Sequence, residues 1–189
     1  MITIIEDFLS PDALATLQRH TRPRRGGRDV YGNLQDRPFL APVQRAAEAH
    51  FPAVIGLVQQ QVLLRFEGNT GLLHHDLNHR PDRVFSLLLY IDEPEQGGEI
   101  VFPLLAPDGQ PRPGPIRQAC QRLASVGQLY SEDAELESYI LDNRAQFLTV
   151  PARTNTAILF PSDDPSMWHF ACPVEAGERC CVVILYRRP

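Results

Sequence analysis

The chain has 189 residues, enough for one domain, and its apolar (43%) and charged (22%) fractions are those of an ordinary globular protein. The formal net charge of −5 argues against a nucleic-acid binder that depends on overall positive charge. All 18 basic residues are arginine. The absence of lysine excludes Schiff-base enzymes, P-loop NTPases and kinases, because each of them needs a lysine for covalent or phosphate chemistry.

We expect neither a membrane-spanning nor a secretory segment in this sequence. No apolar run reaches transmembrane length, and the first residues lack a basic stretch followed by an apolar one. The four cysteines form no C-x-x-C pair, so neither a zinc site nor a disulfide framework is expected. We therefore predict a cytoplasmic protein with reduced thiols and no membrane partner.

The N-terminal part, residues 1–58, is predicted to form a helical cap. A short strand is expected at Ile2–Ile5, followed by a helix that has Ser10 as its N-cap. The segment Arg22–Gly32 is predicted to be a loop and carries four arginines. A second helix is expected from about Pro42 to His50, where the small apolar residues fall on one face.

The next part of the chain changes to short strands separated by Gly, Pro and Asp turns. The run Arg83–Asp92 is nearly continuous in apolar residues, which is typical of a strand buried on both faces. Such a pattern indicates an antiparallel sandwich or barrel over residues 59–103 and 147–189. The other predicted strands are Gln61–Phe66, Leu72–Asp76, Glu99–Phe102, Phe147–Val150, Thr156–Phe160, Met167–Cys172 and Arg179–Arg187.

Residues 104–146 interrupt this β region as a helical insertion. The segment opens with four prolines and then predicts helices at Ile116–Val126 and Ser131–Leu141, the second with Ser131 as its N-cap. Because the insertion is too short for a domain of its own, we interpret it as a lid over a functional site. The alternative is a helical pair that covers a sheet edge or forms a dimer contact.

The most distinctive local motif is His74-His75-Asp76. On an extended strand the side chains of residues i and i+2 share one face, so His74 and Asp76 converge while His75 points the other way. A histidine and a carboxylate placed in this way supply two of the three ligands of a 2-His-1-carboxylate metal site. Such a site leaves adjacent positions on the metal open for a co-substrate.

The third ligand must come from a distant strand, and His169 is the best candidate. His20 and His50 fall on predicted helices and His79 falls in a loop. Ten residues after His169, Arg179 stands at the head of the last apolar strand, where a buried arginine would need an anionic partner. From the residues alone, an exposed arginine at a strand end is an equal alternative.

With their neighbours, these residues resemble the iron(II)/2-oxoglutarate-dependent dioxygenases, in particular the prolyl 4-hydroxylase-like subgroup. The resemblance runs from about Gln61 to Phe102 and from Val150 to Tyr186. It includes the His-x-Asp motif, the run Gly97–Pro103, which is similar to the family's GGE-x-x-FP pattern, and the distal histidine with the basic residue ten positions later.

The resemblance implies a mainly β chain with flanking helices (α+β) that forms a double-stranded β-helix, the cupin-like jelly roll. It implies Fe(II), 2-oxoglutarate and O2 as cofactor and co-substrates, with ascorbate as a candidate reductant. The implied iron ligands are His74, Asp76 and His169. In addition, Arg179 would pair with the C5 carboxylate of 2-oxoglutarate, Tyr90 would donate a hydrogen bond beside it, and Arg83 would lie on the substrate side.

Three departures from the prolyl hydroxylase pattern concern the substrate. Phe66 stands where those enzymes place a tyrosine, and Leu185 stands where their last strand carries a tryptophan. The insertion Leu104–Gln146 has no counterpart in the pattern. These differences argue against a peptidyl-proline substrate and leave the metal and co-substrate chemistry unchanged.

We therefore expect an oxygenase that hydroxylates an unactivated C–H bond of an amino acid, a peptide or another small molecule, with release of succinate and carbon dioxide. One alternative is a non-catalytic, cupin-like sensor of metal and 2-oxoglutarate. Another is a nucleic-acid repair oxygenase, suggested by the arginines of Arg22–Arg28. The last strand, which ends in Arg187-Arg188, does not match the arginine pattern of repair enzymes and disfavours that reading.

Overall fold

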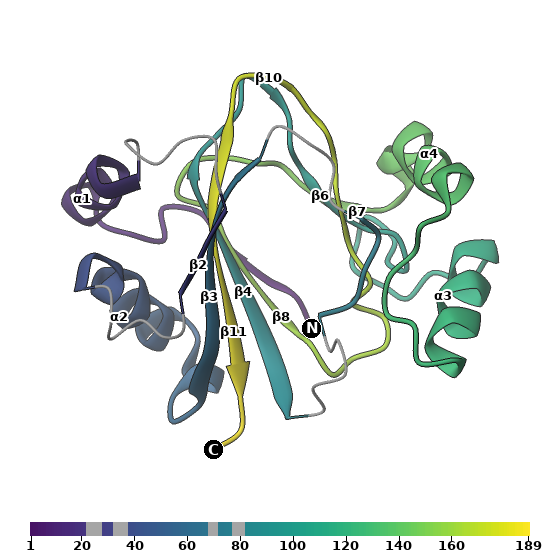
Figure 1. Ribbon diagram of the computed structural model, residues 1–189, viewed down its shortest axis with the longest axis horizontal. Helices are drawn as coiled ribbons and strands as arrows, with labels where there is room; N and C mark the ends of the chain where they lie inside the picture. Colours follow the sequence, from purple (N-terminus) through teal and green to yellow (C-terminus); the bar gives the residue numbers. More distant parts are fainter. Residues whose placement is uncertain (22–27, 32–37, 68–71, 77–81) are drawn as a thin grey trace.

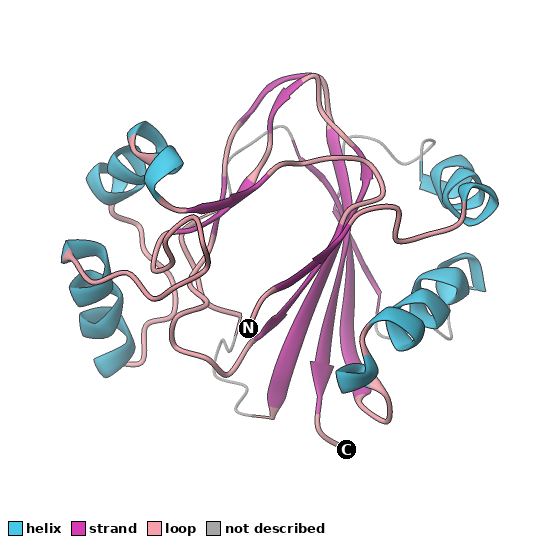
Figure 2. Cartoon of the chain, turned by 180° about the vertical axis from the view of Figure 1, so that it is seen from behind, coloured by secondary structure: helices cyan, strands magenta, loops and turns pink. Residues whose placement is uncertain are grey.

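The structure is a computed structural model that describes residues 1–21, 28–31, 38–67, 72–76 and 82–189. Two antiparallel β-sheets lie between two pairs of helices (Figure 1). Figure 2 shows the same arrangement from behind, with the helices confined to the two outer sides of the molecule.

The larger sheet has six strands and carries most of the apolar runs of the sequence. Its strand order is β1-β8-β4-β11-β3-β2, and each neighbouring pair is antiparallel. The strands are β1 (Thr3–Ile5), β8 (Ala157–Pro161), β4 (Arg83–Asp92), β11 (Arg179–Arg187), β3 (Val58–Glu67) and β2 (Arg28–Tyr31).

A smaller sheet of three strands and a two-stranded ribbon complete the β structure. The smaller sheet has the order β7-β6-β9, and the ribbon pairs β10 with β5. These strands are β7 (Leu148–Val150), β6 (Ile100–Phe102), β9 (Phe170–Ala171), β10 (Val174–Ala176) and β5 (Gln96–Gly97).

The helices cover the outer faces of the two sheets. Helices α1 (Pro11–Thr21) and α2 (Ala41–His50) lie on the side of the larger sheet, and α3 (Pro115–Ser125) and α4 (Ala134–Asp142) lie on the side of the smaller one (Figure 1). Short 3-10 turns occupy Pro38–Leu40, Pro52–Val54 and Arg144–Gln146.

Three apolar layers result, because the strands bury both of their faces. Along β4, Leu87 and Leu89 pack toward α1 and α2, whereas Leu88 and Tyr90 belong to the layer between the two sheets. The third layer lies between the smaller sheet and helices α3 and α4. The prediction that Arg83–Asp92 is a strand buried on both faces is confirmed.

Several predicted elements differ from the structure. Residues 28–31 form a strand on the edge of the larger sheet rather than a loop, and residues 22–27 and 32 of that predicted loop lie outside the described residues. The predicted strand Leu72–Asp76 is reduced to isolated bridges at His74. The predicted strand Met167–Cys172 is regular only at Phe170–Ala171. In both predicted strands, too few residues have a hydrogen-bonded partner on a neighbouring segment for a longer strand to form.

The second helix of the insertion begins later than predicted. Asp133, not Ser131, is the N-cap of α4, and its carboxylate accepts hydrogen bonds from the backbone N–H groups of Glu135 and Leu136 (3.0 and 3.1 Å). The hydroxyl of Ser131 accepts a bond from the N–H of Asp133 (3.1 Å). Both residues are good caps, and tertiary contacts of Ser131, described below, decide between them.

None of the helices in the described ranges is long and apolar enough to cross a membrane.

Candidate metal and 2-oxoglutarate site

The two histidines of the predicted triad lie side by side across an antiparallel bridge. The backbone N–H of His74 donates to the carbonyl of His169, and the N–H of His169 donates to the carbonyl of His74, each at 2.9 Å. Directly opposed residues of an antiparallel pair carry their side chains on the same face. The two imidazole rings therefore lie together, with centroids 4.1 Å apart.

Backbone carbonyls orient both rings in the same way. Nδ1 of His74 lies 2.7 Å from the carbonyl oxygen of Leu72, and Nδ1 of His169 lies 3.0 Å from that of Met167. Since a carbonyl oxygen only accepts, each Nδ1 carries the proton and each Nε2 is left with a free lone pair. A metal ligand needs this tautomer and this orientation.

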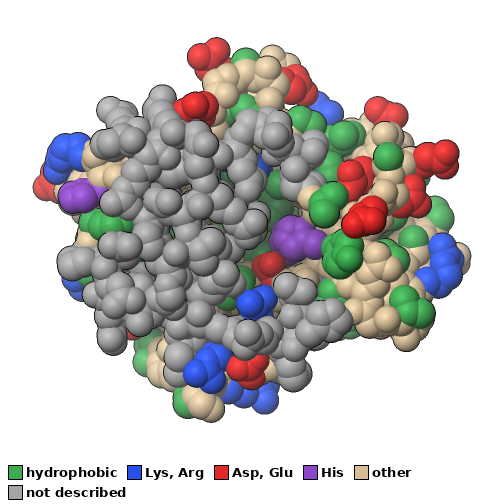
Figure 3. Space-filling model, in the orientation of Figure 1, with side chains coloured by type: hydrophobic (Ala, Val, Ile, Leu, Met, Phe, Trp, Pro, Cys, Tyr) green, Lys and Arg blue, Asp and Glu red, His purple; other side chains and the backbone are tan. Residues whose placement is uncertain are grey.

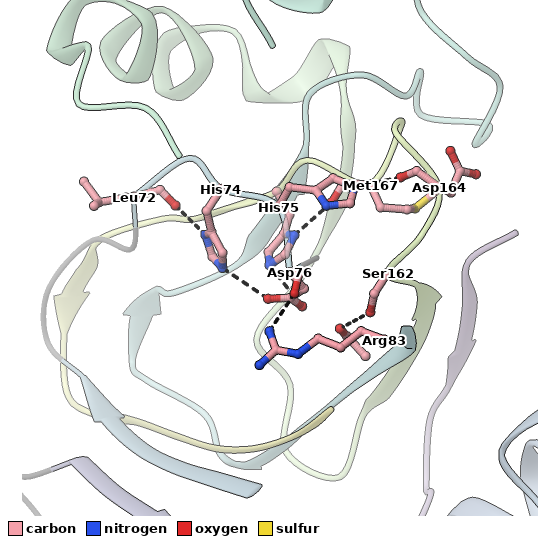
Figure 4. Close-up of polar contacts among 10 residues, drawn as sticks. Leu72, His74, His75, Asp76, Arg83, Ser162, Asp164 and Met167 are labelled. Atoms are coloured by element: carbon pink, nitrogen blue, oxygen red, sulfur yellow. Dashed lines mark hydrogen bonds and ion pairs between the residues drawn. The ribbon is translucent and has the colours of Figure 1, made fainter. Parts of the chain in front are cut away.

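Asp76 completes the site. Its Oδ1 lies 3.6 Å from Nε2 of His74, and its Oδ2 lies 3.8 Å from Nε2 of His169. Figure 4 shows Asp76 below His74, with the main-chain carbonyl of Asp76 held by Arg83. The ligand atoms of the three residues all lie within 4.8 Å of one another, and this is the one such group of His, Cys, Asp or Glu found among the described residues.

The electrostatics of the site suit a divalent cation. Burial raises the pKa of the Asp76 carboxyl, but His169 and the hydrogen bonds of His74 and Ser86 lower it more, so this pKa lies well below its ordinary range. Burial lowers the pKa of His169 to about 3; the His74 ring adds to this shift, and Asp76 opposes it. At neutral pH the site thus offers a carboxylate and a neutral imidazole as donors. Two imidazoles and one carboxylate are the donor set of non-haem Fe(II) oxygenases.

His75 lies on the opposite side of this segment, away from the triad. Its ring is buried, its Nε2 lies 2.9 Å from the carbonyl oxygen of Asp164, and it packs edge-on against Trp168. The ring therefore links the His-x-Asp segment to the turn that precedes His169. It supports the fold and supplies no ligand atom to the triad.

Arg83 and Ser86, both on β4, approach Asp76 from the larger sheet. Arg83 is buried, and its Nη1 donates to the main-chain carbonyl of Asp76 at 2.7 Å. The hydroxyls of Ser86 and Ser162 are hydrogen-bonded to each other at 2.7 Å and are fully buried (Figure 4). These polar groups limit the freedom of the Asp76 segment, as outer contacts of metal ligands commonly do.

A cavity connects the triad to Arg179. The guanidinium group is buried, and its Nη1 donates to the carbonyl of Gly98 at 2.8 Å. The hydroxyl of the buried Tyr90 donates to the same carbonyl at 3.4 Å. The residues that line the cavity are His74, Asp76, Leu88, Tyr90, Ile100, Phe160, His169, Ala171, Arg179, Cys181 and Val183.

The charged and polar groups of this lining suit an anionic ligand that also binds a metal. A guanidinium buried among apolar walls favours an anionic ligand, because desolvation of the charge is then compensated. Burial raises the pKa of Tyr90 far above its ordinary value, against the opposing effect of Arg179, so the phenol keeps its proton and acts as a donor.

The Gly97-Gly98 pair explains how the shared carbonyl is placed. Both glycines have positive φ values (81° and 78°), a conformation that side chains disfavour. A Cβ on Gly97 would come within 2.3 Å of the carbonyl oxygen of Pro173, and a Cβ on Gly98 would come within 3.0 Å of Cγ of Pro94. The two glycines thus allow the turn that carries the Gly98 carbonyl to pack closely against its neighbours.

Comparison with known families agrees with this geometry. A family model described as the 2OG-Fe(II) oxygenase superfamily matches residues 62–187, more than half of the chain. The protein therefore belongs to the 2OG-Fe(II) oxygenase superfamily, whose members use Fe(II) and 2-oxoglutarate. No curated protein matches the sequence significantly.

Solved structures of prolyl hydroxylases share this fold. The viral collagen prolyl hydroxylase vCPH from Paramecium Bursaria Chlorella virus-1, in its 2OG complex, is similar over 100% of this chain and 96% of its own, with 14% identity and a TM-score of 0.64. A Pseudomonas putida prolyl-4-hydroxylase is similar over 100% and 92%, with 17% identity and a TM-score of 0.58.

A third similar structure is not called a prolyl hydroxylase. HygX from Streptomyces hygroscopicus, with iron bound, is similar over 99% of this chain and 82% of its own, with 12% identity and a TM-score of 0.61. These likenesses confirm the predicted double-stranded β-helix.

The structure brings together all the residues predicted for the metal and the co-substrate, and it adds others. The side chain of Phe66 and the whole of His79 lie outside what is described. Ser86 could have been noticed, because it is the one serine or threonine in an apolar strand. The contact of residues 129–131 with the His-x-Asp segment has no signal in the sequence.

We expect His74→Ala and Asp76→Ala to abolish binding of Co²⁺, used as a redox-stable substitute for Fe(II), because each change removes a ligand. His75→Ala should keep the Co²⁺ dissociation constant within a few-fold of that of the unmodified protein, but should lower the free energy of unfolding by about 1–3 kcal/mol, since a buried hydrogen bond is lost. Calorimetric titration and urea unfolding measure the two effects. Loss of Co²⁺ binding in a folded His75→Ala protein would contradict this assignment.

Arg179→Leu should raise the dissociation constant of 2-oxoglutarate about ten- to a hundredfold, because a charge-assisted hydrogen bond contributes about 1.5–3 kcal/mol. Tyr90→Phe removes one neutral donor and should cost about fivefold. The measurement is 2-oxoglutarate titration of the Co²⁺ protein. An unchanged affinity in Arg179→Leu would mean that the co-substrate binds elsewhere.

The metal-free protein should lose stability as the pH falls from about 6.5 toward 3. The pKa of His169 is about 3 in the folded protein, below its ordinary value of 6.5, so in this window the unfolded chain binds the extra proton and is favoured. Urea unfolding in the presence of a chelator at several pH values measures the trend. His169→Gln should reduce the slope, and an equal slope in both proteins would contradict the assignment.

Proposed function

We propose that this protein is an Fe(II)- and 2-oxoglutarate-dependent dioxygenase that hydroxylates an unactivated C–H bond of an amino acid, a peptide or another small molecule. One observation carries the proposal: a 2-His-1-carboxylate triad and a buried arginine line the same cavity. A metal store would need the triad alone, and Arg179 adds a partner for the remote carboxylate of a co-substrate.

When bound, Fe(II) and 2-oxoglutarate together activate O2, so that one oxygen atom enters the substrate C–H bond and the other enters succinate, with release of carbon dioxide. The chain supplies the positioning. His74, Asp76 and His169 would hold the metal, and three protein ligands would leave coordination positions for the co-substrate. Arg179 and Tyr90 orient the co-substrate, and the apolar walls of the cavity exclude water.

The substrate would approach His74 past an apolar rim. Leu72, two residues before His74, and Tyr130, which pairs with His74 across a bridge, are 49% and 43% exposed. Large exposed apolar side chains beside a site commonly contact its ligand. Arg83 remains our proposal for a substrate-side residue, although its Nη1 is engaged by the carbonyl of Asp76.

The substrate class stays open among amino acids, peptides and other small molecules. One similar structure is a prolyl hydroxylase from Trichoplax adhaerens in complex with a hypoxia inducible factor peptide, at 12% identity, and HygX is equally distant. Leu185, which replaces the tryptophan of the prolyl hydroxylase pattern, is buried between the sheets. This difference continues to favour a substrate other than a peptidyl proline.

We also propose that the protein works in the cytoplasm. All four cysteines lie among the described residues, are buried and form no disulfide. Thiols that persist in this state suit a reducing compartment.

The proposed function predicts substrate-stimulated succinate formation. The purified protein with Fe(II), 2-oxoglutarate and ascorbate should be screened by mass spectrometry against free amino acids, short peptides, small metabolites and single-stranded oligonucleotides. At least one amino acid, peptide or metabolite should gain one oxygen atom with equimolar succinate, and Asp76→Ala should give neither product.

Other outcomes of the screen favour the alternatives. Tight 2-oxoglutarate binding without succinate from any compound would favour the sensor, and turnover only with oligonucleotides would favour the repair oxygenase.

A further inference from the structure

The backbone of the His-x-Asp segment is held along both of its edges. One edge is bound by the reciprocal hydrogen bonds between His74 and His169. The other edge is bound by the insertion: the N–H of His75 donates to the carbonyl of Leu129, and the N–H of Ser131 donates to the carbonyl of Leu73, both at 2.8 Å. His74 lies between these two bonds, opposite Tyr130.

A side chain from α4 adds to this second edge. The N–H of Leu73 donates to Oε1 of Glu137 at 3.3 Å. Consequently, each backbone N–H from Leu73 to His75 has a partner, one on the strand of His169 and two on the insertion. A buried backbone donor without such a partner would cost free energy, so this geometry of the segment depends on the insertion.

The part of the insertion that makes these bonds is itself anchored. The N–H of Gln128 donates to the carbonyl of Leu123 at the end of α3 (2.9 Å). Ile116 and Ile140, from α3 and α4, are buried in the same layer as Leu73 and Trp168. These contacts tie residues 128–131 to α3 and α4. The lid role of the insertion stays a prediction.

The space-filling view shows what surrounds the histidines. In Figure 3 one purple group lies near the centre of the face and another at its left edge. Next to the central group, hydrophobic side chains lie on the side of the insertion, with acidic side chains farther out. The insertion therefore reaches the edge of the metal centre itself.

We propose that residues 129–131 of the insertion are a positioning element of the metal centre, which holds the backbone of His74 so that its Nε2 faces Asp76 and His169. This inference rests on the proposed function, in which His74 binds the metal. Coupling between two binding events is reciprocal. If the insertion positions His74, a metal bound by His74 must in turn stabilise the hydrogen bonds between the insertion and the His-x-Asp segment.

Hydrogen exchange of the unmodified protein tests this coupling with Co²⁺ as the probe. Addition of Co²⁺ should slow exchange of the amides of His75 and Ser131 at least tenfold. The amide of Gln128, bonded within the insertion, serves as the control and should change less than twofold. Equal protection factors for His75 and Ser131 with and without Co²⁺ would overturn the proposal.

A pair of substitutions at one position gives a second test. Ser131→Pro removes the N–H that binds Leu73, whereas Ser131→Ala removes only the hydroxyl and keeps this N–H. Ser131→Pro should raise the Co²⁺ dissociation constant about tenfold or more, as changes next to metal ligands do, and Ser131→Ala should change it less than twofold. Affinities are measured well below the unfolding temperature of each metal-free variant, so that lost stability alone does not alter them.

The outcomes separate this inference from the proposed function. If the unmodified protein binds no Co²⁺, both are rejected. If it binds Co²⁺ but a folded Ser131→Pro keeps the same affinity, the positioning role alone is rejected. If Ser131→Pro does not fold, the exchange experiment on the unmodified protein decides.

Discussion

The site depends on one reciprocal contact, the pair of 2.9 Å backbone hydrogen bonds between His74 and His169. These residues belong to segments far apart in the sequence, and the contact makes them direct neighbours across an isolated antiparallel bridge. Because opposed residues of an antiparallel pair share a face, the contact also sets the direction of both rings. Asp76 then needs only to lie two residues farther along to complete the triad.

The alternation of side chains assigns the two faces of this region to different tasks. His74 and His169 face the cavity. Leu73 and Trp168 instead pack in the layer that holds α3 and α4, and His75 packs against Trp168. The metal-binding face can therefore carry polar groups, because the opposite face of the same few residues supplies the buried apolar contacts.

The alternation of side chains between the two faces of a strand also explains why Arg179, at the start of β11, faces the cavity. Along β11, Cys181 and Val183 face the layer between the sheets, and Arg179 shares their side. The carbonyl of Gly98 binds the guanidinium group and the hydroxyl of Tyr90 together. One backbone carbonyl, set by a glycine turn that no other residue adopts easily, thus orients both donors toward the space in front of the triad.

The sequence by itself determined the chemistry of this protein. The spacing of His74 and Asp76, the distal His169 and the arginine ten residues later are local patterns, and the double apolar face of Arg83–Asp92 is visible as a continuous run. Only the folded structure reveals the contact between the insertion and the metal-binding segment. The insertion contacts the His-x-Asp segment through the backbone N–H and carbonyl groups of residues 129–131. Every amino acid except proline carries both groups, so no side-chain pattern predicts this contact. For the same reason Ser131 looked like a helix cap: its N–H binds Leu73 across the fold, and helix α4 begins only after Asp133.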